Sequence, residues 1–234
     1  MRLCVIPARG GSKRIYKKNI KEFCGRPIIA WVIETAVTSE CFDRVIVSTD
    51  DEEIANVAKE WGAEVPFCRP AKLADDFALT VDVIRHAIKV VAPDGSNIQG
   101  VCCLYPTAVF VTAEMLRSGW LKLVTTGASY VLPVTSYGHP VGRALRLVND
   151  SAIEMIVPEN YSVRSQDLEL AFHDVGQFYW GKVLAWLGGC QILGPDSRAL
   201  ELPRHIAQDI DTQEDWDIAE ALFSARMNKQ VQEG

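Results

Sequence analysis

The sequence lacks the features that mark secreted, membrane-spanning and metal-cluster proteins. Its first residues form only a short apolar run with no small-residue cleavage pattern, so we expect no signal peptide. No stretch approaches the roughly 18 consecutive apolar residues of a membrane span. The seven cysteines are odd in number and contain no CxxC pair, which indicates neither a disulfide framework nor a zinc site. We therefore expect a cytoplasmic protein that is not associated with a membrane.

Two widespread nucleotide-binding motifs are also missing. The pattern GxxxxGK[ST] of P-loop enzymes and the pattern GxGxxG of nicotinamide dehydrogenases do not occur. The net charge of −6 argues against a protein that coats nucleic acid, so no nucleic-acid partner is expected.

The composition that is present is that of an ordinary globular protein. The chain has 234 residues, of which 48% are hydrophobic and 23% charged. This length and balance suit one well-packed domain over residues 1–234. No internal repeat or flexible linker interrupts it.

Short apolar runs alternate with segments whose apolar residues have helical spacing. The expected strands are residues 3–8, 45–47, 64–67, 101–105, 129–134 and 176–180. The expected helices are residues 28–37, a segment capped by Asp50 or Asp51 and ended by Gly62, a segment with Val83 to Val91 on its apolar face, and residues 114–124, 182–187 and 212–227. This alternation predicts an α/β fold, with a mostly parallel sheet and helices on both faces. Such a sheet binds ligands at the carboxyl ends of its strands.

The alternation breaks between residues 135 and 172. Pro140, Gly142, Asn149 and Pro158 divide this stretch into short mixed segments. We interpret it as an insertion in the domain, because it shows no regular pattern of its own.

A basic loop from Arg9 to Asn19 follows the first expected strand. Two glycines let backbone N–H groups turn toward an anion, and Arg9, Lys13 and Arg14 supply positive charge in an acidic chain. A bound polyphosphate would relieve the repulsion among these cations. A solvated, lysine-rich turn explains the composition equally well, so the loop alone does not identify a site.

Asp209 and Asp211 precede the last expected helix, with Ile210 between them. In an extended segment alternate residues face the same side, so both carboxylates could bind one Mg²⁺ ion. Capping of the helix by Thr212 or Asp211 is an equal alternative, although Asp209 lies too early to cap.

Six blocks, read together and in order, carry a resemblance over nearly the whole chain. They are IPARGGSKRIYKKNI, VIVSTDDEEIA, RPAKLADD, LYPTAVF, FHDVGQFYWG and QDIDTQEDWDIAE. They resemble the acylneuraminate cytidylyltransferase (CMP-sialic acid synthetase) family, and HDVGQFYWG looks closest to its pseudaminic acid branch. The resemblance implies a Rossmann-like nucleotidyltransferase fold, a small dimerisation insertion at 135–172 and a homodimer. It also implies that CMP passes from CTP to the anomeric hydroxyl of a nine-carbon 2-keto sugar acid, with Mg²⁺ as cofactor and release of pyrophosphate.

The resemblance assigns roles residue by residue. The nucleotide site would comprise Ala8, Arg9, Gly10, Gly11, Ser12, Lys13, Lys18, Asn19, Arg69 and Thr80, the last two at the cytosine. Arg9, Lys13 and Lys18 would hold the phosphates in catalysis, and Asp209 and Asp211 would bind the metal. The sugar site would comprise Tyr105, Arg143, Arg164, His173, Gln177 and Tyr179.

Some positions depart from the family pattern. Tyr16 stands where a proline is usual, and the segment Val109-Phe110-Val111 lacks an expected cation. These changes affect the choice of sugar more than the reaction. Legionaminic or sialic acid as the acceptor, and a non-catalytic nucleotide-binding member, therefore remain as alternatives.

Overall fold

A seven-stranded sheet organises the chain, of which the computed structural model describes residues 1–93 and 97–233. The strand order is β11-β6-β10-β5-β1-β4, and β9 pairs with β6. The strands are β1 (Arg2–Pro7), β4 (Arg44–Ser48), β5 (Gly100–Leu104), β6 (Tyr130–Ser136), β9 (Phe172–Asp174), β10 (Phe178–Gly181) and β11 (Ser197–Glu201). β1 is parallel to β4 and β5, and β11 is parallel to β6, whereas β10 is antiparallel to both β5 and β6. β4, β1, β5, β6 and β11 thus share one direction, which confirms the mostly parallel sheet.

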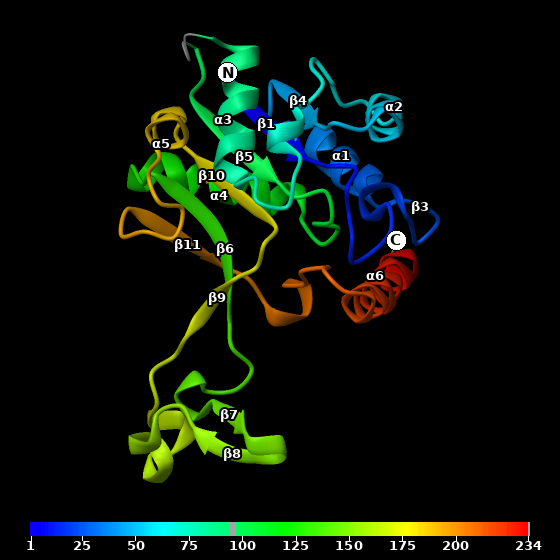
Figure 1. The fold of residues 1–234 in the computed structure, drawn as a ribbon. Coiled ribbons are helices and arrows are strands. Elements are labelled where there is room, and N and C mark those ends of the chain that lie inside the picture. The colour runs from blue at the N-terminus through cyan, green and yellow to red at the C-terminus, as the bar shows by residue number, and fades with distance from the viewer. Residues whose placement is uncertain (94–96, 234) are drawn as a thin grey trace.

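Helices cover both faces of this sheet (Figure 1). They are α1 (Ile28–Thr38), α2 (Glu52–Glu60), α3 (Thr80–Val91), α4 (Ala113–Thr126), α5 (Val183–Gly188) and α6 (Gln213–Glu233). Because side chains alternate along a strand, Cys4 and Ile6 of β1 join the core with α1, α4 and α6, while Leu3 and Val5 join the core with α3 and α5. The α/β fold predicted from the alternation is confirmed. No helix in the described part of the chain is long and apolar enough to cross a bilayer.

Two details correct the expected elements. Residues 64–67 form no strand, because this segment meets the sheet only through isolated bridges from Glu64 to Ile46 and from Cys68 to Thr49. The last helix runs to Glu233 and is longer than expected. The predicted cap of α2 is confirmed, since the Asp51 side chain accepts a hydrogen bond from the Ile54 N–H at 3.0 Å.

The segment between β6 and β9 forms a small lobe that projects from the body (Figure 1). Its centre is an antiparallel hairpin of β7 (Leu145–Val148) and β8 (Ala152–Met155). The short 3-10 helices η3 (Val141–Arg143), η4 (Asn149–Ser151), η5 (Pro158–Ser162) and η6 (Ser165–Asp167) surround it. The role of this lobe in dimerisation stays a prediction.

Several loops meet at one edge of the sheet. The carboxyl ends of β1, β4 and β5 lead to the basic loop, to Thr49 and to Tyr105. The antiparallel β10 starts at this edge, so the preceding turn at Gly176 lies there as well. Side chains from distant parts of the sequence therefore gather at this edge.

Candidate active site

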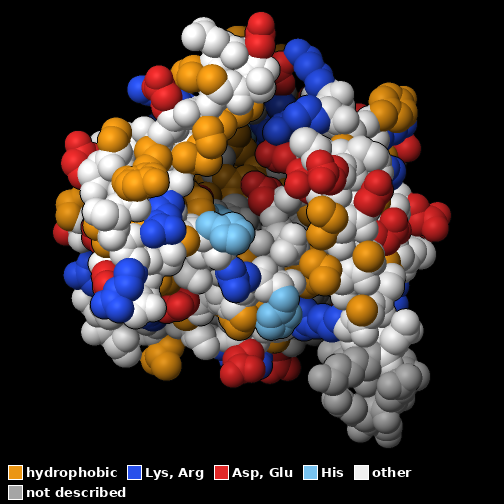
Figure 2. All heavy atoms as spheres, turned by 90° about the horizontal axis from the view of Figure 1, so that it is seen from below, with side chains coloured by type: hydrophobic (Ala, Val, Ile, Leu, Met, Phe, Trp, Pro, Cys, Tyr) orange, Lys and Arg blue, Asp and Glu red, His pale blue; other side chains and the backbone are white. Residues whose placement is uncertain are grey.

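A cleft of about 260 Å³ lies at the carboxyl ends of the central strands. The predicted residues that line it are Arg9, Ser12, Lys13, Lys18, Asn19, Arg69, Thr80 and Tyr105. Pro7, Arg14, Asp76 and Thr107 complete much of the wall. The face of the molecule toward the lobe is hollowed, with apolar atoms in its depth and charged side chains beside them (Figure 2).

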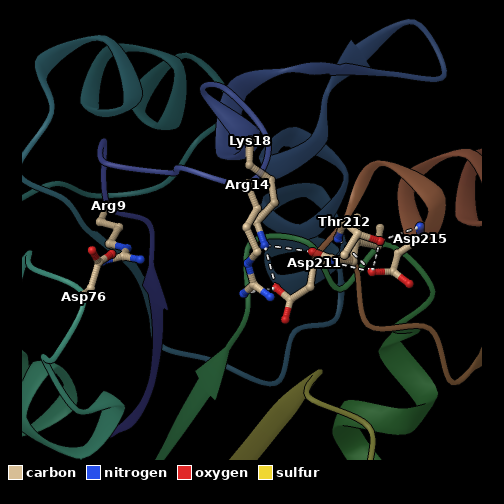
Figure 3. Close-up of polar contacts among 8 residues, drawn as sticks. Arg9, Arg14, Lys18, Asp76, Asp211, Thr212 and Asp215 are labelled. Atoms are coloured by element: carbon tan, nitrogen blue, oxygen red, sulfur yellow. Dashed lines mark hydrogen bonds and ion pairs between the residues drawn. The ribbon is translucent and has the colours of Figure 1, made fainter. Parts of the chain in front are cut away.

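One end of the cleft is cationic and carries its own counter-charge. The Arg9 guanidinium lies 2.8 Å from one oxygen of Asp76 (Figure 3). Lys13 Nζ lies 2.5 Å from the other oxygen. The hydrogen bond from Lys13 and then that from Arg9 lower the pKa of the Asp76 carboxyl. Asp76 belongs to the RPAKLADD block, but no spacing rule would have brought it to the basic loop.

The backbone of the basic loop is less available to an anion than expected. The Gly10 N–H donates to Asp50 Oδ1 at 3.0 Å, and the Ser12 N–H donates to the Gly10 carbonyl at 2.9 Å. A Cβ on Gly10 would lie 2.7 Å from Asp51 Oδ2, so close packing requires this glycine. Ala8 is buried in the core. Ala8, Gly10 and Gly11 do not line the cleft, and their contact with the nucleotide stays a prediction.

Asn19 and Arg69 line the cleft from largely buried positions, each with 4% of its surface exposed. Asn19 Nδ2 donates to the Arg9 carbonyl at 2.9 Å and so holds the loop. Arg69 Nε donates to Ser48 Oγ at 3.1 Å, and burial lowers the pKa of its guanidinium to about 10. Both side chains therefore fix neighbouring segments as well as facing the cleft.

Hydroxyl groups mark the other end of the cleft. Thr80 Oγ1 lies 2.9 Å from the Tyr105 hydroxyl, and the rings of Tyr105 and Tyr179 meet edge to face with centroids 5.6 Å apart. The Tyr179 hydroxyl donates to Asp174 Oδ2. Desolvation raises the pKa of both tyrosines, so both hydroxyls keep their protons. Asp174 carries no predicted role, although an aspartate two residues before a glycine is a recognisable turn signal.

Asp209 and Asp211 lie beside the cations of the basic loop. Asp211 Oδ1 is 3.1 Å from Lys18 Nζ and 2.9 Å from the Arg14 guanidinium (Figure 3). Asp209 keeps a face open to solvent, yet desolvation by the surrounding protein and then the charge of Asp211 raise its pKa to about 6. The metal role of these two carboxylates stays a prediction.

Capping of α6 uses other side chains. The Asp215 N–H donates to Thr212 Oγ1 at 3.2 Å, and Asp215 Oδ2 accepts from the Thr212 N–H at 2.7 Å. This reciprocal pair is a capping box with aspartate as the return acceptor. Thr212 and Asp215 therefore cap the helix, and the carboxylates of Asp209 and Asp211 are left for another role.

Several residues predicted at the sugar do not line this cleft. Gln177 is fully buried and its Nε2 donates to the Ile206 carbonyl at 2.7 Å, so it ties β10 to the segment before Asp209. Its contact with the sugar stays a prediction. Arg143 donates to the Val163 carbonyl at 2.6 Å within the lobe. Arg164 pairs with Asp167 at 3.0 Å, also within the lobe. The contact of these two arginines with a sugar stays a prediction.

His173 lies where the lobe joins the body. Its ring packs against Tyr137 with centroids 4.9 Å apart, and its Nδ1 lies 2.9 Å from the Asp174 carbonyl. It does not line the cleft, but it directly precedes the carboxylate that holds Tyr179.

The fold and the cleft together define the class of the protein. A mostly parallel sheet carries a basic, partly apolar cleft at its carboxyl edge, with two carboxylates next to the cations. This arrangement is that of an α/β enzyme that handles a nucleotide phosphate.

Comparison with known proteins narrows this class. Residues 3–160 match the family model described as Cytidylyltransferase. The chain is 41% identical over 221 residues to a pseudaminic acid cytidylyltransferase of Campylobacter jejuni, covering 94% of this chain and 95% of that protein. It is 32% identical to a CMP-N,N'-diacetyllegionaminic acid synthase of Legionella pneumophila, covering 94% of this chain and 95% of that protein. The chain belongs to the cytidylyltransferase family and is related to the CMP-sialic acid synthetases.

A solved structure agrees with the fold. A CMP:2-keto-3-deoxy-manno-octonic acid synthetase complexed with CTP superposes with a TM-score of 0.70, covering 96% of this chain and 99% of that one at 16% identity. Membership of the cytidylyltransferase family makes the protein a nucleotidyltransferase, and enzymes of this kind generally use a divalent metal ion.

Proposed function

We propose that this protein transfers CMP from CTP to the anomeric hydroxyl of a nine-carbon 2-keto sugar acid, with pseudaminic acid as the preferred acceptor. The observation that carries this proposal is the cleft itself, which joins the cations of the basic loop to the hydroxyls of Thr80 and Tyr105. In the reaction, the anomeric oxygen forms a bond to the α-phosphorus, and the bond from that phosphorus to the bridging oxygen of pyrophosphate breaks. The hydroxyl proton is released to solvent.

The phosphates are assigned to the cationic end. Arg9, Lys13 and Lys18 line the cleft there and provide positive charge for the β- and γ-phosphates. Because transfer of this kind requires no covalent bond to the protein, positioning and charge stabilisation account for most of the catalysis. Asp76 must release Arg9 and Lys13 before these cations pair with a nucleotide.

Asp209 and Asp211 suit a Mg²⁺ ion. Their oxygens are the hard ligands that Mg²⁺ prefers, and this ion typically takes one or two carboxylates together with phosphate oxygens and water. Desolvation and then the charge of Asp211 raise the pKa of Asp209, and a divalent cation bound there would favour the ionised carboxylate. A bound Mg²⁺ ion would neutralise phosphate charge and acidify the sugar hydroxyl. The chain's own contribution is to hold Asp211 in place through Lys18 and Arg14.

Pseudaminic acid is the preferred acceptor on two grounds. Two relatives named for this sugar cover 94% of the chain at 41% and 40% identity, above the 32% of the relative named for a legionaminic acid. Tyr105, which stands where sialic acid enzymes tend to have glutamine, lines the cleft and presents a hydroxyl in place of an amide.

A homodimer is proposed from the lobe. Leu145 pairs with Met155 and Leu147 pairs with Ile153 across the hairpin, so these side chains share one face. Leu147 and Ile153 are 79% and 61% exposed in the single chain. A two-stranded hairpin alone is marginally stable in water, so packing of this face against a second copy of the lobe would stabilise it.

A pyrophosphate-release assay tests the proposal. CTP is incubated with Mg²⁺ and with pseudaminic, legionaminic or sialic acid in separate reactions, and release is expected with CTP and the sugar acid together and fastest with pseudaminic acid. Asp211→Asn should reduce turnover by on the order of 100-fold, since it removes a charge from the reacting centre. Asp217→Asn, on the exposed face of α6, is the matched control and should retain wild-type turnover. Release without any sugar acid, or equal loss in both variants, would overturn the assignment.

A further inference from the structure

The cations of the basic loop form two groups, each around its own carboxylate. One group surrounds Asp76, and the other surrounds Asp211, whose Oδ1 lies 2.9 Å from the Arg14 guanidinium and 3.1 Å from Lys18 Nζ. The pair of Arg9 with Asp76 lies apart from the cluster around Asp211 (Figure 3). The loop therefore presents positive charge in two places, and the second of them is next to the predicted metal site.

Arg14 is the less constrained of the two cations at Asp211. Lys18 Nζ also donates to the Ile210 carbonyl at 2.7 Å, and its side chain is only 19% exposed. The Arg14 side chain lines the cleft and is 65% exposed, and within the part of the chain that the structure describes its only polar contact is that with Asp211. If Asp211 binds a metal ion, the Arg14 guanidinium loses this partner and is free to turn toward a bound anion.

The proposed acceptor carries a negative charge at its reacting carbon. In the ring form of a 2-keto sugar acid, the anomeric hydroxyl and the carboxylate are bonded to the same carbon atom. A hydroxyl that attacks the α-phosphorus beside Asp209 and Asp211 therefore brings the carboxylate to the same place. A carboxylate among phosphate and aspartate oxygens is costly to desolvate unless a cation lies beside it. The reacting centre thus needs a cation that the phosphates do not use.

The other arginines near the cleft or predicted at the sugar already have partners. Arg69 is only 4% exposed, and its nitrogens donate to the Ser48 hydroxyl and to two backbone carbonyls. Arg143 and Arg164 contact groups within the lobe. The remaining cations of the basic loop that line the cleft are assigned to the phosphates. Arg14 is therefore the cation beside the reacting centre that has most freedom to bind a carboxylate.

We propose that Arg14 binds the carboxylate of the sugar acid, its guanidinium leaving Asp211 to donate two hydrogen bonds to the two carboxylate oxygens. The planar fork of a guanidinium matches a carboxylate in this way, whereas the ammonium group of lysine is a point charge. This inference rests on the proposed function for the identity of the acceptor and deepens it. It makes Arg14 the residue that selects a sugar acid over a neutral sugar of similar shape.

Binding of pseudaminic acid and of its methyl ester tests this role. Calorimetry measures both on enzyme that holds Mg²⁺ and α,β-methylene CTP, an analogue that cannot release pyrophosphate, and thermal melting checks that each variant folds. Arg14→Gln should weaken binding of the acid by about 10- to 100-fold and leave binding of the ester unchanged. Lys17→Gln is the matched control, because Lys17 belongs to the same loop but pairs with Glu53 and does not line the cleft. It should change neither affinity.

Arg14→Lys should recover part of the affinity for the acid, because it keeps the charge without the fork. Equal weakening of acid and ester in Arg14→Gln would show that Arg14 acts only by holding Asp211, and would overturn the proposal. Unchanged binding of the acid with weaker binding of CTP would assign Arg14 to the phosphates and overturn it as well. In both cases the wild type binds the acid and the proposed function stands. A wild type that binds no sugar acid would refute the proposed function and this inference together.

Discussion

Substitution of Gly176 by alanine should damage activity far more than stability. Gly176 has φ of +66°, in the left-handed region, where a side chain costs about 1–2 kcal/mol. In a chain of this length such a loss lowers the melting temperature by roughly 2–8 °C. The added Cβ would also lie 3.1 Å from Asp209 Oδ2 and 3.3 Å from its Cγ, closer than most such contacts. The Asp209 carboxylate must therefore shift by a few tenths of an ångström.

Gly127→Ala provides a closely matched control. Gly127 has φ of +65°, and the nearest atom to its added Cβ is Lys182 Nζ at 3.9 Å, an ordinary contact. Both variants should melt at similar temperatures, because the backbone penalty is the same. Only Gly176→Ala should raise the Mg²⁺ concentration needed for half-maximal turnover, measured by pyrophosphate release. Equal Mg²⁺ dependence in the two variants would refute the placement of the metal at Asp209.

Three further outcomes are expected. The pKa of Asp209 is raised from 3.8 to about 6, so its negative charge lowers the stability of the folded protein above pH 6. Asp209→Asn should therefore have a higher melting temperature than the wild type at pH 8 without Mg²⁺. This difference in melting temperature should vanish as the pH falls to about 4, where the wild-type carboxyl is protonated as well. Asp76→Asn frees Arg9 and Lys13 and should tighten CTP binding in calorimetry; unchanged affinity would contradict their role at the phosphates. Leu147→Asp should give a monomer by light scattering, and the single chain should keep its melting temperature because Leu147 is exposed in it. A dimer that persists in this variant would exclude this face of the lobe as the dimer interface.

Much of the fold follows from local pattern. The apolar run at β1 and the helical spacing of α3 are properties of neighbouring residues, and both elements form close to the expected bounds. Residues 64–67 look like a strand by composition, but pairing depends on what lies beside them, and there they meet β4 only through single bridges. Strand formation at an edge cannot be deduced from the segment alone.

The site was predictable where charge density marked it. Arg9, Lys13 and Lys18 form a cationic cluster within an acidic sequence, and they do line the cleft. Asp76 and Asp174 were not predictable from spacing, because each meets its partners only after the sheet has brought separate loops together. The position of Gln177 beside the aromatic residues of β10 suggested a ligand contact, and only the folded chain shows that its Nε2 donates to a backbone carbonyl inside the protein.

The attachment of the lobe has a consequence for engineering and for divergence among relatives. Ser136 and Phe172 are direct partners in the antiparallel pairing of β6 with β9, so the chain leaves the body and returns to it at adjacent points. A tight hairpin turn can bridge two such positions in place of residues 137 to 171. The lobe is thus an exchangeable module: its length and sequence can change without altering the register of the sheet that carries the cleft. The lobe can then be redesigned separately from the cleft.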